Sequence, residues 1–195
     1  MRKPLINKKT LISLFIVFVM VLSTFGFILS YQTGGGQREE YNGHKLTITD
    51  QGTMAKIDGK KIYFSNFPTQ LEDINMSSEL KDALKNAKML TITYNPGEEW
   101  AEAMADVQYQ AEQSLPEYTE IYVARGVTNA KDFNYTLPEF TCKNATSGAP
   151  VLNLQEGNEI EIVLKNNCII ASAKSENDFY RMYERILYAI LGIME

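Results

Sequence analysis

The side chains of this sequence that could carry chemistry begin with two cysteines, Cys142 and Cys168, the only ones in the 195-residue chain. In an oxidising compartment two cysteines allow one intramolecular pairing, so we predict a disulfide between them. The alternative is a pair of half-buried thiols, as in a cytosolic protein. The choice depends on the side of a membrane on which this part of the chain lies.

A glycosylation pattern lies beside the first cysteine. Asn144 begins one of three Asn-x-Ser/Thr triplets, the pattern that accepts N-linked glycans, and the other two begin at Asn75 and Asn134. Such triplets arise easily by chance, and their use depends on a host with the glycosylation machinery. The three asparagines are therefore candidate glycosylation sites, and Cys142 and Asn144 are expected to share one external surface loop.

The residues that enzymes use most are scarce. The one histidine is His44, so neither a Ser-His-Asp nor a Cys-His arrangement is supported, and no cluster has the three or four ligands of a zinc site. Glycine-rich phosphate-binding motifs are absent from the sequence. We therefore assign no catalytic, cofactor-binding or metal-binding residue.

Carboxylates are the remaining chemical groups. The pairs Glu72-Asp73 and Glu98-Glu99, together with Glu139, could in principle run acid–base chemistry on sugars. Glu98 and Glu99 also lie in a turn between an expected strand and helix, where α/β folds bind ligands. Because both acids would occupy the positive end of the helix dipole and repel phosphate, we interpret this turn as helix capping and the other acids as solvated.

The element that locates these residues is the N-terminal segment. Residues 11–30, LISLFIVFVMVLSTFGFILS, carry no charge and would form a helix of about 30 Å, the thickness of a bilayer's hydrocarbon core. Residues 1–10 are a basic flank, which favours a cytoplasmic N-terminus and a domain outside. The alternative is a cleaved signal peptide, whose apolar core is normally shorter. We predict an uncleaved single-pass anchor in the cell membrane, with the bilayer as partner of residues 11–30.

The rest of the chain divides into a flexible tether, 31–40, and a single extracytoplasmic domain, 41–195. Four of the 19 basic residues precede the span, which leaves 15 basic against 24 acidic residues and a net charge near −9. That charge disfavours binding to nucleic acid and to anionic lipid headgroups. The acidity is expected to keep an exposed surface domain soluble.

Periodicity predicts an α+β or α/β domain, with one mixed sheet and about three helices behind the membrane helix. A hairpin is expected at Asp58-Gly59, and a strand, helix and parallel strand over 88–125 form a predicted βαβ unit. Ser77 is expected to cap a helix over 77–86. The remaining strands are expected at 45–49, 151–154, 159–164 and 168–173, with turns at Gly157-Asn158 and Asn166-Asn167.

A C-terminal amphipathic helix is expected after Ser175. Its apolar side comprises Phe179, Met182, Tyr183, Ile186, Leu187, Ile190 and Leu191. We interpret this side as a core face, because the polar side mixes charge signs, whereas helices that lie in a membrane interface usually carry a basic face. Most tyrosines, such as Tyr63, Tyr94 and Tyr122, are expected in the core or on half-buried sheet positions.

Residues 140–194 contain both cysteines, the Asn144 sequon, the Gly-Asn turn and the Arg-Ile-Leu-Tyr helix. In this layout the segment resembles the tail of uncharacterised single-pass membrane-anchored archaeal surface proteins. The resemblance implies a location and an architecture, and it implies no site residue.

Two functions are consistent with these features. The first is a non-catalytic interaction or accessory module of the cell envelope, with a protein partner and no nucleic acid. The alternative is an envelope-facing small-ligand receptor or carboxylate-dependent hydrolase. A flat exposed patch favours the first, and a deep pocket with convergent carboxylates favours the second.

Overall fold

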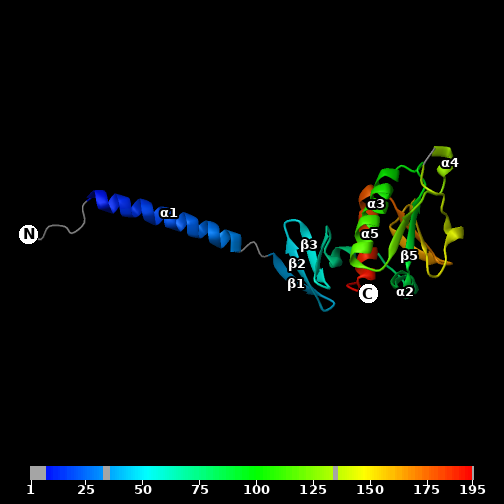
Figure 1. Cartoon of the computed structure of the whole chain (residues 1–195), viewed down its shortest axis with the longest axis horizontal. Coiled ribbons are helices and arrows are strands. Elements are labelled where there is room, and N and C mark those ends of the chain that lie inside the picture. The colour runs from blue at the N-terminus through cyan, green and yellow to red at the C-terminus, as the bar shows by residue number, and fades with distance from the viewer. Residues whose placement is uncertain (1–7, 33–35, 134–135, 195) are drawn as a thin grey trace, which may run out of the picture. The chain divides into compact units, whose positions relative to one another are not determined.

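The computed structural model describes residues 8–32, 36–133 and 136–194. The chain divides into two compact units, 1–38 and 39–195, which are described separately (Figure 1).

The first unit consists of helix α1 (Lys8–Gln32). Its segment Lys9–Gly26 has a mean hydropathy of 2.0 and contains no buried residue, so by length and composition α1 is able to cross a membrane. The hydroxyl of Thr24 donates to the carbonyls of Met20 and Val21, at 3.1 and 2.9 Å, which satisfies this polar group within the helix. The predicted span, 11–30, lies inside α1.

A four-stranded meander follows, in the order β1-β2-β3-β4, and the boundary between the two units falls after Arg38, within its first strand. Its strands are β1 (Gln37–Tyr41), β2 (His44–Thr49), β3 (Gly52–Ile57) and β4 (Lys60–Phe64). The predicted hairpin is confirmed, since Asp58 and Gly59 have φ of 49° and 84° between the antiparallel strands β3 and β4. The tether predicted over 31–40 overlaps two regular elements, because α1 runs through Gln32 and β1 begins at Gln37.

The chain then forms a short 3-10 helix, η1 (Pro68–Leu71), and helix α2 (Ser78–Asn86). The predicted cap of α2 is confirmed, because the Ser77 hydroxyl accepts a hydrogen bond from the Leu80 N–H at 3.2 Å. Leu80 and Leu84 are the buried residues of this helix.

A five-stranded mixed sheet follows, in the order β6-β5-β7-β9-β8. Strands β5 (Met89–Tyr94) and β6 (Tyr122–Arg125) are parallel and are joined by α3 (Ala101–Tyr118), which confirms the predicted βαβ unit. The remaining elements are α4 (Ala130–Phe133), η2 (Cys142–Asn144), β7 (Val151–Glu156), β8 (Glu161–Lys165), β9 (Cys168–Ala173) and α5 (Glu176–Ile190). The α+β class is thus confirmed, and the described part of the domain holds α2, α3, α5 and the single turn α4. The prediction of one mixed sheet is corrected, because β1 to β4 pair only with one another and form a second, separate sheet.

The connection from β7 to β8 differs from the predicted turn at Gly157-Asn158. β8 pairs antiparallel with β9, and β9 lies parallel to β7, so the chain after β7 crosses the end of β9. Gly157 donates its N–H to the Ala173 carbonyl at 2.8 Å, and a Cβ at this glycine would meet the Ser172 Cβ at 2.8 Å. Glycine at position 157 therefore allows two chain segments to approach closely. The second predicted turn, Asn166-Asn167, has positive φ at both residues and joins β8 to β9.

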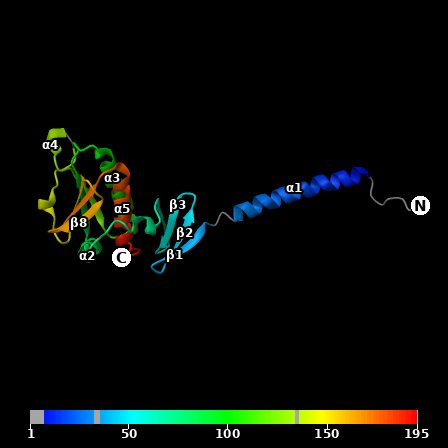
Figure 2. The ribbon, with the colours of Figure 1, turned by 180° about the vertical axis from the view of Figure 1, so that it is seen from behind.

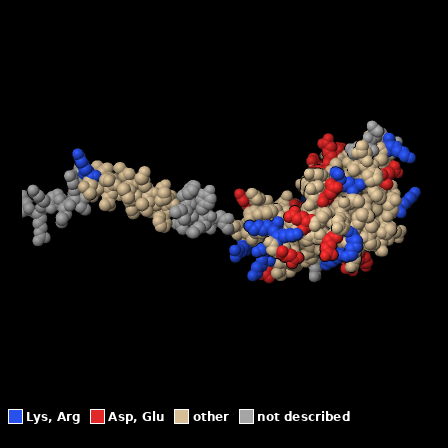
Figure 3. Space-filling view, in the orientation of Figure 1, with Lys and Arg blue, Asp and Glu red and all other residues tan. Residues whose placement is uncertain are grey.

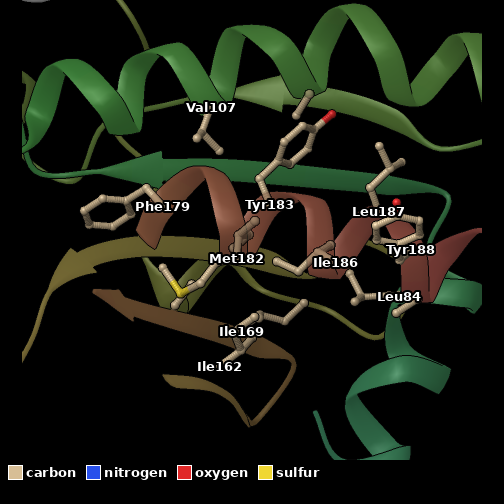
Figure 4. Close-up of a cluster of buried hydrophobic side chains, with 14 of the residues drawn as sticks. Leu84, Val107, Ile162, Ile169, Phe179, Met182, Tyr183, Ile186, Leu187 and Tyr188 are labelled. Carbon is tan, nitrogen blue, oxygen red and sulfur yellow. The ribbon is translucent and has the colours of Figure 1, made fainter. Parts of the chain in front are cut away.

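Helices α3 and α5 lie side by side on one face of the mixed sheet (Figures 1 and 2). Met182 and Ile186 of α5 point toward Ile162 of β8 and Ile169 of β9, with Val107 of α3 on the other side (Figure 4). These side chains are at most 4% exposed. The predicted apolar side of α5 is thus a core face, since Phe179, Met182, Tyr183, Ile186 and Leu187 are buried.

Gln108 fixes α3 to the sheet. Its side-chain Nε2 donates to the carbonyls of Ile92, at 2.6 Å, and Gly126, at 2.8 Å, and the residue is 2% exposed. This amide therefore joins α3 to β5 and to the residue that follows β6, with its donor fully used inside the core.

Candidate functional site

The predicted disulfide is present. Cys142 of η2 and Cys168, the first residue of β9, are bonded with their Cα atoms 5.1 Å apart, and the described residues contain no free cysteine. The bond ties the connection between β6 and β7 to the mixed sheet. The Thr93 hydroxyl adds a second attachment, because it donates to the Phe140 carbonyl at 2.9 Å.

Two of the three sequon asparagines lie on described, exposed positions. Asn144 is in η2, and its side-chain oxygen accepts the Thr141 N–H at 2.9 Å. Asn75 lies two residues before the Ser77 cap of α2. Asn134 lies outside the described residues. Cys142 and Asn144 share one exposed turn, as expected.

The predicted carboxylate pairs are separated by their contacts. Asp73 pairs with Arg181 at 2.8 Å, while Glu72 accepts a hydrogen bond from the Tyr41 hydroxyl at 3.1 Å. Glu139 is exposed and lies in an isolated bridge to Val127. Among the residues with described positions, neither the Glu72-Asp73 pair nor Glu139 forms a two-carboxylate site.

Glu98 instead meets Glu156, a residue that sequence reasoning did not single out. The Glu98 carboxylate accepts the Glu156 N–H at 2.6 Å, and the Glu156 carboxylate accepts the Trp100 N–H at 3.1 Å. Burial, and then the charge of Glu156, raise the pKa of Glu98, while the hydrogen bond from the Glu156 N–H opposes this shift. The capping interpretation is corrected in its detail: Glu156, from β7, binds the backbone N–H just before α3.

These carboxylates lie at the carboxyl ends of β5 and β7, where the strand order reverses direction and α/β sheets commonly bind ligands. A shallow hollow beside them is lined by Glu99, Trp100, Glu156, Gly157, Asn158, Ala173 and Lys174. Within the described ranges, no group of three His, Cys, Asp or Glu side chains is placed to hold a metal ion.

A second depression, of about 400 Å³, lies where β4 meets α3 and α5. Five of its lining side chains are tyrosines, and we call it the tyrosine groove: Tyr63 of β4, Tyr109 and Tyr118 of α3, and Tyr180 and Tyr183 of α5. Tyr63 and Tyr109 are 50% and 53% exposed, whereas Tyr183 is 7% exposed. The groove therefore has a buried wall and two accessible rings.

Local geometry explains how these rings reach one place. Tyr63 lies between buried Ile62 and Phe64 on β4, and alternation along a strand turns its ring away from the core. On α5, Tyr180 and Glu184 are four residues apart and share one side of the helix. Tyr109 of α3 is two residues away from each of the buried residues Val107 and Ala111, so its ring points away from the core side of the helix.

The polar groups of the groove are neutral apart from one carboxylate. The hydroxyls of Ser114 and Tyr183 are hydrogen-bonded, and burial raises the pKa of Tyr183 to about 12. Burial, and then a hydrogen bond with Asp106, raise the pKa of Tyr180. Both phenols therefore stay protonated at neutral pH.

The one carboxylate is that of Glu184, which joins two of the segments that line the groove. It accepts hydrogen bonds from the backbone N–H groups of Ser65 and Asn66, at 2.5 and 2.9 Å, and from the Asn66 side chain at 2.7 Å. The segment after β4 is thereby attached to α5. Because its oxygens are occupied in this way, Glu184 is a structural tie of the groove.

No protein-family model, curated protein or solved structure matches the chain. The resemblance of residues 140–194 to archaeal surface proteins stays a prediction.

The chemistry of the tyrosine groove suits binding. Tyrosine rings offer flat apolar contact with a polar edge, and the amides of Gln110 and Gln113 add donors and acceptors beside them. Sequence reasoning placed Tyr63, Tyr94, Tyr122 and Tyr183 in the core or on half-buried positions. That is correct for Tyr94 and Tyr183, at 2% and 7% exposed, and for Tyr63, a half-buried sheet position at 50%, and it is wrong for Tyr122, which is 74% exposed.

Proposed function

We propose that this chain is a non-catalytic interaction module of the cell envelope, which contacts a protein partner through the tyrosine groove. The observation that carries the proposal is the convergence of five tyrosines from β4, α3 and α5 beside two amides. Tyrosine is enriched at protein interfaces because a rigid amphipathic ring buries much area at a small entropy cost. Tyr63 and Tyr109 offer about half of their surface to such a contact.

The proposal includes anchoring by α1 and a location of the second unit outside the cell. The exposed apolar helix supports the anchor, and the Cys142–Cys168 disulfide supports an oxidising surrounding. The basic residues before the span support a cytoplasmic N-terminus. Together these features favour a single-pass protein with its C-terminal domain outside.

A carboxylate-dependent hydrolase is the second candidate, and the raised pKa of Glu98 favours it, because a general acid must be protonated near the working pH. Against it, the carboxylates of Glu98 and Glu156 each accept a backbone N–H and so have a structural task. Glycan hydrolysis by the full chain that disappears in Glu98→Gln would favour the hydrolase over the interaction module.

The interaction proposal is tested with a photoreactive phenylalanine analogue placed at position 109 of the full chain in its native membrane. We expect one discrete cross-linked product, which weakens when Tyr63→Ser is added. The matched control carries the same analogue at position 122, because Tyr122 is even more exposed than Tyr109 and is not among the groove residues. Equal cross-linking from both positions, or none from 109, contradicts the proposal.

A further inference from the structure

The solvent face of the meander carries a row of lysines. Lys56 of β3 lies directly opposite Lys61 of β4. Lys45 precedes Leu46, which lies opposite Ala55, so Lys45 stands on β2 beside Lys56. All three lysines are exposed and alternate with the buried residues Leu46, Ala55 and Ile62. We call Lys45, Lys56 and Lys61 the lysine row.

None of the ion pairs among the described residues involves the row, and Glu40 of β1, across the Asn42-Gly43 turn from Lys45, is an acid beside it. Those ion pairs involve arginines, and Lys60, next to the row, donates to the Glu117 carbonyl. Like charges directly opposite one another on a sheet are destabilising. The lysine row therefore lowers the stability of the meander. This cost indicates that the lysines bind something other than the protein itself.

The row is also an exception to the acidic character of the chain. From His44 to Phe64 there are four lysines and two aspartates, and both aspartates, Asp50 and Asp58, lie in turns. Figure 3 shows several Lys and Arg side chains over the meander with Asp and Glu side chains among them, and side chains of both signs over the rest of the second unit. The net charge of the whole domain, from which we inferred that anionic headgroups are disfavoured, thus conceals a basic sheet face.

The meander is close to the membrane helix along the chain. Helix α1 ends at Gln32 and β1 begins at Gln37, so five Cα–Cα steps separate the two residues. An extended chain covers about 3.5 Å per step, which limits this separation to about 18 Å. If α1 spans a bilayer, the first strand of the meander cannot leave the neighbourhood of the bilayer surface.

We propose that the lysine row docks the meander onto anionic lipid headgroups of the membrane that α1 crosses. The inference rests on the proposed anchoring through α1, and the face that would dock includes Tyr63, which also lines the tyrosine groove. The three ammonium groups would donate hydrogen bonds to headgroup phosphate oxygens, and β1 adds Arg38 and Glu40, one charge of each sign. A lysine near an anionic surface favours association about fivefold, so three lysines favour the docked state about a hundredfold.

The test uses the full chain at one copy per nanodisc, with either phosphocholine lipid alone or added phosphoglycerol lipid. An amine-acylating reagent is applied, and peptide mass spectrometry gives the acylation rate of each lysine. We expect the lysine row to react about fivefold or more slowly in anionic nanodiscs. The exposed lysines Lys85, Lys143 and Lys165 should react equally in both lipids. Salt at about 1 M, which shortens the Debye length to about 3 Å, should abolish the difference.

A second readout covers the variants. Hydroxyl-radical oxidation of Met54 and Tyr63, which share the solvent face with the row, reports whether that face is covered. The triple variant K45Q/K56Q/K61Q should lose the protection given by anionic lipid, and the matched variant K85Q/K143Q/K165Q should keep it. Equal acylation in the two lipids, or equal protection by phosphocholine alone, overturns the docking and leaves the anchoring intact. Failure of the chain to enter nanodiscs overturns both.

Discussion

The two sheets of the second unit differ in how their faces are covered. Strand β5 of the mixed sheet is buried from Leu90 through Tyr94, so both of its faces lie inside the protein. Strand β4 of the meander alternates between exposed and buried residues, with Lys61 and Tyr63 in solvent and Ile62 and Phe64 in the core. We call the mixed sheet the scaffold, and only its strand β5 is covered on both faces, since Asn153, Gln155 and Ser172 on one face of β7 and β9 are partly exposed. The meander keeps one face in solvent.

The same division separates the sites. The mixed sheet carries the disulfide and the paired carboxylates Glu98 and Glu156, which are used for internal bonds. The meander contributes the lysine row and Tyr63, whose side chains are exposed. The exposed side chains proposed to make contacts therefore lie mainly on the sheet that has an uncovered face. Substitutions in the two regions should differ in how much they change the stability of the protein.

The largest expected effect is in the scaffold. Phe179→Ala removes a ring that is 0% exposed, at the start of α5, and should lower the free energy of unfolding by about 3–5 kcal/mol. Tyr122→Ala, at a 74% exposed edge position, should change it by less than about 0.5 kcal/mol. Urea unfolding of the full chain in detergent, followed by Trp100 fluorescence, measures both. Similar costs for the two variants would contradict the assignment of the scaffold core.

Removal of the disulfide is the next largest change. The double variant Cys142→Ala, Cys168→Ala releases a loop with a sequence separation of 26, which costs about 3–4 kcal/mol if the bond acts by restricting the unfolded chain. The unsubstituted protein should lose a similar amount when reductant is added. Unfolding midpoints that do not respond to reductant would show that the bond is absent from the native protein.

Glu184→Gln should have an intermediate effect that concentrates in the meander. A glutamine offers one acceptor oxygen where the carboxylate accepts three hydrogen bonds from Ser65 and Asn66, so we expect a loss of about 1–3 kcal/mol. Amide hydrogen exchange should quicken in β4 and stay unchanged in β5. Glu176→Gln, at an exposed position in the first turn of α5, is the control. Equal acceleration in both strands would mean that Glu184 supports the whole unit.

The smallest expected effect is a pH dependence from Glu98. The pKa of this carboxyl is raised in the folded state, chiefly by burial, so folding is favoured when it is protonated. Its contribution to stability is therefore complete below the ordinary glutamate pKa and is lost as the pH rises through the raised value. Glu98→Gln should remove this fall from the curve of melting temperature against pH. A fall that persists in the variant must come from another group.

Local structure was predictable from the sequence because it depends on neighbouring residues. The Asp58-Gly59 and Asn166-Asn167 turns have the positive φ that their residue types tolerate, and Ser77 caps α2. The disulfide was predictable because the sequence contains two cysteines and therefore allows one intramolecular pairing. Ser175 precedes α5 as expected, but its hydroxyl donates to the Asp178 carboxylate and leaves the backbone N–H groups of the helix without this cap.

Strand pairing was not predictable in the same way. Alternation tells which side of a strand is buried, but the partner of that strand depends on contacts between segments far apart in the chain. The separation of the meander from the mixed sheet and the passage of Gly157 over the end of β9 follow from such contacts. The partnership of Glu98 with Glu156 depends on the same arrangement.

The tyrosine groove was missed for a related reason. Its rings come from β4, α3 and α5, so no single window of the sequence contains the pattern. Helix α3 also continues to Tyr118. Pro116 lies in its last turn, and the N–H and hydroxyl of Thr119 donate to the Leu115 carbonyl at 2.9 and 2.7 Å. The best available signal was Tyr109, a large aromatic residue that is not among the buried residues of this helix.

Protease treatment of intact cells of the native host tests most directly whether the second unit is an anchored domain outside the cell. We predict that residues 39–195 are removed without lysis, while a fragment containing α1 stays with the membrane. A cytoplasmic protein that survives the same treatment shows that the cells are intact. A full-length chain that becomes sensitive only after lysis would contradict the proposed location and, with it, the account of the disulfide and of the tyrosine groove.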